Sequence, residues 1–505
     1  MKAHTFCTTL LLLAASGLAW AAPQFDRVYG SHMVLPQGKA VPISGTTDAS
    51  GEIVVRFDGQ TVPATRTGNK WKAELKPMKA NKTGQKLTVT QGKDTVELDD
   101  VLIGEVWLAS GQSNMLWRLN QTPEGKNAIQ KADNAQIRIL HNEPQVHTNP
   151  AAYKDADRAK LTKDQFYTGQ WAVNSPQSAP RMSAIAYHFA NVLQKELDVP
   201  VGIIHSSLGG SEMAAWIPDS ILKKKPFYSS CRGNKWLESP LISPWARGRA
   251  KQNIAQTLSS GEPMHPYKPG FLYSSGIEWI APLPVNGIIW YQGETDAEAQ
   301  DMKQNATLLR DLITSWRQAF GNAELPFVMV QLPRINDKSA VRAYWPEFRA
   351  VQDGIAATMP NVASVTTIDL GSTNSNVHPP SKTEVGTRLA HTAAARFYGK
   401  DLPYSGPAME QKAAAGASLT IRMKHADGMK TTDGQAPRGF EIAGKDKKFH
   451  PATAVIEGNT VKLTAPQVQN PVHARYAWAT FLEPNLVNKD NLPAVPFSTA
   501  LGQPK

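Results

Sequence analysis

A strand that ends in small polar residues constrains this chain more than any other feature. Residues 104–115 read Gly-Glu-Val-Trp-Leu-Ala-Ser-Gly-Gln-Ser-Asn-Met and continue an apolar run that starts at residue 101. Such a run is typical of a buried parallel strand, and open α/β sheets bind their ligands at the carboxyl ends of these strands. Gly111 permits a sharp turn, so Ser113 is a candidate nucleophile. The same residues also suit an ordinary strand-to-helix turn capped by Ser113 or Asn114.

Between residues 101 and 405 the sequence alternates strand and helix patterns, which predicts an α/β domain with a parallel sheet. The predicted strands are short apolar runs at 101–109, 201–204, 285–290, 327–332 and 362–368. The predicted helices carry apolar residues at helical spacing, at 186–197, 308–320 and 388–397.

The two flanking regions have β texture. Residues 22–100 contain short alternating runs separated by Gly, Asn and Asp turns, which indicates a small β-sandwich. Residues 406–505 form a second β region. The predicted strands are 53–57, 71–75 and 87–89 in the first region, and 418–421, 440–442, 460–463 and 476–478 in the second.

One long segment, residues 219–275, is predicted to be an irregular insertion, because six prolines interrupt it. A long loop in a compact domain usually shapes or covers a site, although a disordered insertion has similar composition. The aromatic content favours a lid, through Trp236, Trp245, Tyr267, Phe271 and Tyr273.

The first 21 residues predict a cleaved secretory signal peptide. They combine Lys2, an apolar core at 10–15 and an Ala-Trp-Ala ending at Ala21. We therefore expect a periplasmic or secreted protein. No later segment offers about 18 uncharged apolar residues, so no membrane span is expected. Cys231 is the one cysteine of the mature sequence, which rules out an intramolecular disulfide and leaves a buried, inert thiol as the expectation.

The charge pattern argues against nucleic acid as a partner. The formal net charge is +11, but the basic residues are dispersed. No arginine stripe with interleaved aromatic residues is present, and such a stripe is the usual mark of a nucleic-acid surface.

A serine nucleophile requires a base within hydrogen-bond reach, and histidine is the usual one. His378 is the best candidate, because it lies in the loop that follows the last predicted strand of the sheet. That loop opens at the same edge as the loop carrying Ser113. A single histidine in a loop is more often an ordinary surface residue. The assignment of His378 as the base therefore rests on its position at this edge of the sheet.

Two further loops leave the sheet at this edge. Residues 205–211 contain Gly209 and Gly210, whose backbone N–H groups are able to approach a substrate closely. Residues 290–296 contain Gln292, whose side-chain amide is a candidate second donor to an oxyanion. Each loop alone is explained by turn chemistry, but together they predict an acyl-transfer site.

Three motifs resemble those of the sialate O-acetylesterases of the SGNH hydrolase superfamily. They are Gly-Gln-Ser-Asn-Met at 111–115, Trp-Tyr-Gln-Gly-Glu at 290–294 and Val-His-Pro at 377–379. Further similar stretches extend the resemblance over the mature chain, at 32–37, 104–107, 326–327, 330–332 and 476–478. The resemblance implies a flavodoxin-like three-layer α/β/α domain and a serine esterase that removes O-acetyl groups from sugars without a metal or other cofactor.

On this resemblance Ser113 is the nucleophile, His378 is the base, and Gly209 or Gly210 with Gln292 would hold the oxyanion. The chain departs from the family where an acid often precedes the histidine, since these positions hold Ser375 and Asn376. Asp369 is one alternative orienting acid, and a Ser–His dyad is another. Asp296 occupies a position where the family frequently has asparagine. A carboxylate there puts a hydrogen-bond donor role for that position in question.

The sequence thus predicts a carbohydrate esterase acting on O-acetylated sialic acid, with an acetylxylan or related polysaccharide esterase as the alternative. A glycan-binding protein on an inactive esterase scaffold is the alternative of another class. A sialate carboxylate calls for a cation facing the site, for which Arg334 is a guess. The oligomeric state stays open.

Overall fold

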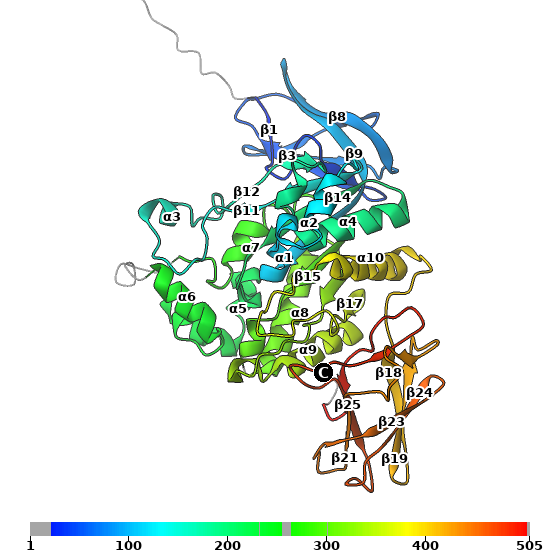
Figure 1. Cartoon of the computed structure of the whole chain (residues 1–505). Helices are drawn as coiled ribbons and strands as arrows, with labels where there is room; N and C mark the ends of the chain where they lie inside the picture. The colour runs from blue at the N-terminus through cyan, green and yellow to red at the C-terminus, as the bar shows by residue number, and fades with distance from the viewer. Residues whose placement is uncertain (1–21, 232, 255–263, 300, 502–505) are drawn as a thin grey trace, which may run out of the picture.

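The computed structural model describes residues 22–231, 233–254, 264–299 and 301–501 (Figure 1). The predicted signal peptide lies outside the described residues. Within them, no helix combines the length and apolar character needed to cross a bilayer.

A seven-strand path in the order β13–β10–β14–β9–β15–β16–β17 forms the centre of the molecule. All neighbours on this path are parallel except β13 and β10. This confirms the predicted parallel α/β sheet, to which β10 and β13 are unpredicted additions. The strands are β9 (Asp94–Gly111), β10 (Ile137–His141), β13 (Trp171–Val173), β14 (Val201–Ser207), β15 (Gly287–Tyr291), β16 (Phe327–Val330) and β17 (Val362–Val365).

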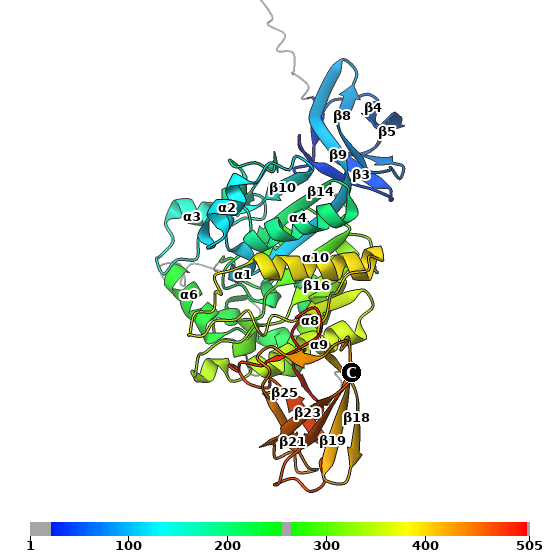
Figure 2. The ribbon, with the colours of Figure 1, turned by 45° about the vertical axis from the view of Figure 1, so that its right-hand side comes forward.

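Two pairs of helices pack on this sheet (Figure 2). Helices α4 (Ala184–Leu197) and α10 (Thr383–Tyr398) contact each other and the sheet strands, while α8 (Met302–Ala319) contacts α9 (Trp345–Thr358). The three predicted helices overlap α4, α8 and α10. Helix α9 was not predicted. Its Pro346 is compatible with a helix because it lies in the first turn, where a missing N–H costs no hydrogen bond.

Strand β9 links the N-terminal β region to the central sheet. Its 18 residues pair first with β8 (Asn81–Gln91) and β2 (Val34–Pro36), and then with β14 and β15. The two regions share one hydrophobic core. The boundary expected near residue 100 therefore falls inside a continuous strand.

The remaining strands of the N-terminal region confirm its β texture. One sheet has the order β1–β3–β7–β6, and β4 and β5 join β8 in the sheet that continues through β9. The elements are β1 (Gln24–Phe25), β3 (Val41–Thr46), β4 (Ile53–Phe57), β5 (Gln60–Pro63), β6 (Thr65–Thr67) and β7 (Lys70–Leu75).

The C-terminal β region has a separate core. Its strands are β18 (Ala408–Ala415), β19 (Ser418–Lys424), β20 (Lys430–Thr431), β21 (Phe440–Ala443), β22 (His450–Pro451), β23 (Thr453–Glu457), β24 (Thr460–Thr464), β25 (His473–Tyr476), β26 (Leu486–Val487) and β27 (Phe497–Ser498). The strand predicted at 476–478 is wrong beyond Tyr476, because Ala477 adopts a left-handed conformation with φ of 50°.

The segment 219–275 is more regular than predicted. Its described part holds α5 (Asp219–Leu222), α6 (Pro244–Ile254), the start of α7 (Phe271–Gly276) and two 3-10 turns, at Pro226–Cys231 and Gly233–Leu237. Two of the prolines that suggested irregularity begin helical elements, a position that proline favours. Trp236 and Tyr267 are buried, so this part packs onto the domain.

Candidate active site

The sheet register places the loops that follow β9, β14 and β15 side by side at one edge of the sheet. Gly111, the last residue of β9, pairs with Ser207 of β14 on one side and with Tyr291 of β15 on the other. The chain crosses from one side of β9 to the other between these neighbours, so the end of β9 is the point where ligands bind in such sheets.

Gly111 is required for the turn that follows. Its φ is 142°, and a Cβ there would lie 2.0 Å from the carbonyl oxygen of Tyr291. A side chain is therefore excluded by both conformation and space. The chain turns at once into the short helix α1 (Ser113–Leu116), with Ser113 as its first residue.

The structure brings the predicted nucleophile and base together. Nε2 of His378 lies 2.8 Å from Oγ of Ser113, although the two residues are 265 positions apart in the chain. His378 belongs to the long loop between β17 and α10, and its ring stacks on Trp117 with centroids 4.9 Å apart. This is the geometry in which a neutral imidazole accepts a proton from a serine hydroxyl.

Burial, and secondarily the charge of Lys382, lower the pKa of His378 to about 4. Both effects disfavour the imidazolium. His378 is consequently neutral at pH 7 and has a lone pair for Ser113.

The glycine loop after β14 lies beside Ser113. A Cβ on Gly209 would be 3.6 Å from Cβ of Ser113, and the Gly209 carbonyl accepts a hydrogen bond from the Tyr267 hydroxyl at 2.7 Å. Gly210 has φ of 71°. Neither glycine N–H donates to another backbone or side-chain group of the described residues. The N–H of Ser113, at the start of α1, has no intrahelical acceptor either. Three backbone donors are thus available near the nucleophile.

The geometry does not support Gln292 as an oxyanion donor. Its Nε2 donates to the Ser211 carbonyl at 3.2 Å and to the Asp296 carboxylate, which uses both amide protons. Asp296 also accepts from the N–H of Met213 at 3.1 Å, and burial raises its pKa to about 7. Asp296 is an acceptor here, so Gln292 braces this loop and does not point its N–H groups at Ser113.

Asp369 does not orient His378. Its two oxygens accept bonds of 2.8 and 2.7 Å from Arg388, a bidentate pair that occupies the carboxylate. Among the described residues no carboxylate forms a hydrogen bond or ion pair with His378. Asn376 instead accepts the backbone N–H of His378 at 3.0 Å.

A buried polar network surrounds the pair and was not predicted. Asn114 donates through Nδ2 to Glu294 Oε1 at 2.5 Å and to the Val377 carbonyl at 3.0 Å. Lys382 donates through Nζ to Asn114 Oδ1 and to the Pro379 carbonyl, both at 2.6 Å. Asn114 and Glu294 stand in the motifs already quoted. The sequence carries no comparable signal for Lys382.

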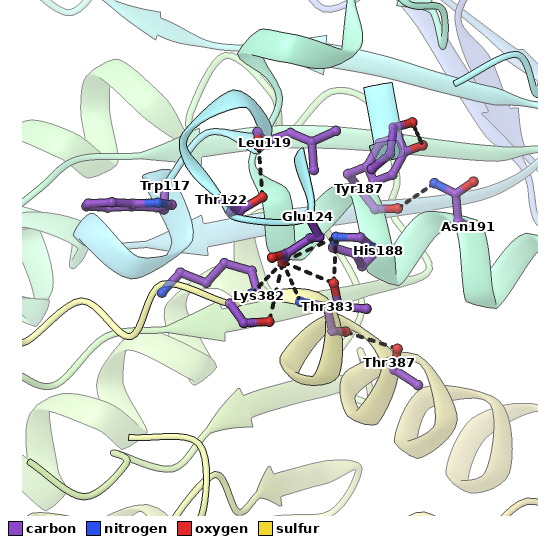
Figure 3. A network of polar contacts seen from close by, with 12 residues as sticks. Trp117, Leu119, Thr122, Glu124, Tyr187, His188, Asn191, Lys382, Thr383 and Thr387 are labelled. Carbon is purple, nitrogen blue, oxygen red and sulfur yellow. Dashed lines mark hydrogen bonds and ion pairs between the residues drawn. The ribbon is translucent and has the colours of Figure 1, made fainter. Parts of the chain in front are cut away.

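Glu124 holds the start of α10 next to this network (Figure 3). Its Oε1 accepts the backbone N–H groups of Lys382 and Thr383, at 2.9 and 3.2 Å. Burial alone would raise the pKa of Glu124, but the bonds from the Lys382 backbone and the Thr383 hydroxyl, together with the nearby His188, lower it overall. A carboxylate at a helix N-terminus is favourable, and it fixes where α10 begins.

Two further residues singled out from the sequence have other partners. Arg334 contacts the C-terminal region, 3.8 Å from Glu483 and 5.7 Å from the Phe481 ring. The buried Cys231 thiol donates to Ser239 at 3.1 Å, and burial raises its pKa.

A family model described as carbohydrate esterase, sialic acid-specific acetylesterase, matches residues 252–395. The crystal structure of a carbohydrate acetylesterase from Xanthomonas citri is similar over 94% of this chain and 99% of that chain, with a TM-score of 0.78 and 30% identity. The chain belongs to the sialate O-acetylesterase family.

Animal members of the sialate O-acetylesterase family are similar over most of their length. The human sialate O-acetylesterase is 28% identical over 79% of this chain and 76% of its own. The Pongo abelii protein is 27% identical over 93% of this chain and 90% of its own. As a family member the chain is a carboxylic ester hydrolase.

Proposed function

We propose that this esterase removes O-acetyl groups from carbohydrates through an acetyl-enzyme on Ser113. The 2.8 Å contact between Ser113 Oγ and His378 Nε2 carries the proposal. Oγ attacks the acetyl carbonyl while His378 accepts its proton, and the imidazolium then protonates the departing sugar oxygen, which leaves as a hydroxyl. Water, deprotonated by His378, attacks the acetyl-enzyme, His378 returns that proton to Ser113 Oγ, and acetic acid leaves and ionises to acetate in solution.

The backbone N–H groups of Ser113, Gly209 and Gly210 would hold the tetrahedral oxyanion. Fixed backbone dipoles stabilise negative charge without reorganising during the reaction. Because Gln292 is held by Asp296 and Ser211, the proposal needs no side-chain donor.

The catalytic unit in this proposal is the three-layer α/β/α domain of SGNH hydrolases, over residues 101–405. The β regions at 22–100 and 406–505 would flank it, and the enzyme would be exported after cleavage behind Ala21. N-terminal sequencing of the protein recovered outside the cytoplasm tests the cleavage site.

O-acetylated sialic acid is the proposed substrate, as in the relatives named sialate O-acetylesterase. An acetylated neutral polysaccharide such as acetylxylan is the second candidate. It is favoured by Trp245, which is 43% exposed and packs against Gly210, next to the proposed oxyanion site. An exposed indole offers a surface on which sugar rings stack.

Acetate release from O-acetylated sialic acid and from acetylated xylan, compared at equal acetyl concentration, separates these candidates. A higher kcat/KM on sialic acid supports the first candidate, and a higher value on xylan supports the second. If neither these substrates nor a chromogenic acetyl ester is hydrolysed, the proposal is wrong and the glycan-binding alternative is favoured.

The pH dependence of kcat/KM provides an independent prediction. The acid limb reports the base of the free enzyme, which must be unprotonated to act. Since the pKa of His378 is lowered to about 4, kcat/KM should stay level from pH 7 to about pH 5 and fall below about pH 4. Initial rates on a chromogenic acetyl ester test this, with tryptophan fluorescence showing that the protein stays folded. An acid limb near the ordinary histidine value of about 6.5 would contradict it.

A further inference from the structure

The geometry around His378 points to a device that replaces the missing orienting acid. We propose that Asn114, Glu294 and Lys382 form a positioning clamp, which holds His378 against Ser113 without touching the imidazole. The inference rests on the proposed roles of Ser113 and His378, and its test is chosen to fail separately from theirs.

The clamp grips the backbone on both sides of the base. Asn114 Nδ2 donates to the carbonyl of Val377 at 3.0 Å, and Lys382 Nζ donates to the carbonyl of Pro379 at 2.6 Å. These carbonyls belong to the residues directly before and after His378. With both held, the backbone that carries the imidazole has little freedom to rotate away from Ser113.

The clamp also fixes this loop to the nucleophile. Asn114 follows Ser113 in the chain, and its Oδ1 accepts a bond of 2.6 Å from Lys382. Glu294, from the loop after β15, fixes the same amide from the other side at 2.5 Å. Asn114 is thus the point at which the loops after β9, β15 and β17 are joined, and these loops contain the three motifs of the sequence.

Burial makes the clamp sensitive to each of its members. Asn114, Lys382 and Glu294 expose 0%, 1% and 3% of their surface. Buried polar groups that lose a partner incur a large desolvation cost, so a satisfied network specifies one arrangement. One Glu294 oxygen, Oε2, has no partner among the described residues, so the network is satisfied at Asn114 and Lys382 and incomplete at that atom.

Lys382 is itself held in position from two sides. Glu124 accepts its backbone N–H at 2.9 Å, and its ammonium lies 5.8 Å from the centre of the Trp117 ring, over the ring face (Figure 3). Trp117 stacks on the imidazole of His378. The clamp and the aromatic stack therefore restrain the base from its backbone and from its ring.

Lys382, the clamp member whose charge acts on His378, differs from a triad acid in the sign of its charge. A carboxylate would raise the pKa of His378, whereas Lys382 lowers it. Lys382 is the charged side chain that acts on His378 among the described residues, and Glu294 and Glu124 act on Lys382 in turn, partly offsetting the burial that lowers its pKa to about 7. Removing Lys382 should therefore affect both position and proton affinity, and the second effect separates a clamp from a merely structural lysine.

Lys382→Met tests the clamp, because it keeps the length of the side chain and removes both hydrogen bonds and the charge. We expect kcat on a chromogenic acetyl ester to fall by about 10- to 100-fold, the range seen when groups that orient functional residues are removed, with KM changed less than about twofold. The acid limb of kcat/KM should also move to higher pH.

Asn114→Leu is the second variant, in case Lys382→Met does not fold. It should lower kcat by a similar factor, and the double variant should be little worse than the weaker single variant, because both changes break one unit. Lys39→Met is the matched control. Lys39 is half-buried and donates to the Val285 carbonyl at 3.1 Å, and its loss should leave kcat and the acid limb unchanged.

The clamp is refuted if folded Lys382→Met keeps the parental kcat and acid limb, or if the two changes act additively in the double variant. These results would leave the proposed function standing, because it is judged on the parental enzyme and on the Ser113 and His378 variants.

Discussion

Replacing Ser113 with alanine should lower kcat for acetate release by a factor on the order of 10⁴ to 10⁶, the range lost when a serine nucleophile is removed. The variant keeps the backbone donors near Gly209 and Gly210 but has no atom that forms the acetyl-enzyme. Residual turnover would come from water attacking a bound ester. Initial rates with a chromogenic acetyl ester and direct acetate detection measure this loss.

The fold of Ser113→Ala should be unchanged. The Ser113 side chain has one hydrogen-bond partner among the described residues, His378, so its removal leaves no deeply buried group unpaired. The thermal midpoint of unfolding should stay within about 2 °C of the parent. Substitutions at partly exposed positions such as Ser113 usually change the free energy of unfolding by less than about 0.5 kcal/mol. A folded variant that hydrolyses the ester at the parental rate would show that another residue is the nucleophile.

Replacing His378 with alanine should lower kcat by a similar factor, on the order of 10⁴ or more, because nucleophile and base act as a unit. Without the imidazole the Ser113 hydroxyl has no hydrogen-bond partner among the described residues that could accept its proton. The remaining activity should also lose the acid limb that His378 produces, which a simple loss of stability would not cause. Rates between pH 4 and pH 8 test both effects.

His391→Ala is the control for this change. His391 lies in α10, downstream of the same loop, and takes no part in the Ser113 contact. It should keep the parental rate and the acid limb. If His378→Ala behaves like this control, the base is a different group and the proposed mechanism fails.

Much of the sheet was predictable because its strands are continuous apolar runs. Strand β10 was missed because Arg138 interrupts its run, and the structure shows why an arginine is tolerated there. Arg138 is 4% exposed and forms an ion pair with Asp100 at 2.6 Å. In the sequence a charged residue indicates a surface position, and only the structure shows that Arg138 is buried against Asp100, 38 positions away.

The pairing of Ser113 with His378 followed from topology, because loops after parallel strands share one edge. The assignment of Gln292 failed for a different reason. Its amide has a partner within its own loop, Asp296, and the sequence gives no sign of which way such a side chain turns. Asp369 has a distant partner instead, since its carboxylate accepts two bonds from Arg388 of α10, 19 positions along the chain.

The clamp illustrates what sequence patterns leave out. Asn114 and Glu294 are visible within motifs, but Lys382 is an ordinary lysine near prolines in the sequence. Its importance arises from burial and from two acceptors at 2.6 Å, which depend on the path of the loop between β17 and α10. Hydrogen-bond networks of this kind are specified by the assembled fold.

The acetyl-enzyme tests the central claim most directly. The esterase is mixed with an excess of chromogenic acetyl ester, quenched in acid during turnover, digested and analysed by peptide mass spectrometry. We predict that one acetyl group is found on the peptide containing Ser113, and that it is absent from Ser113→Ala treated in the same way. An acetyl group on a different residue, or rapid turnover with no acetylated peptide, would contradict the account.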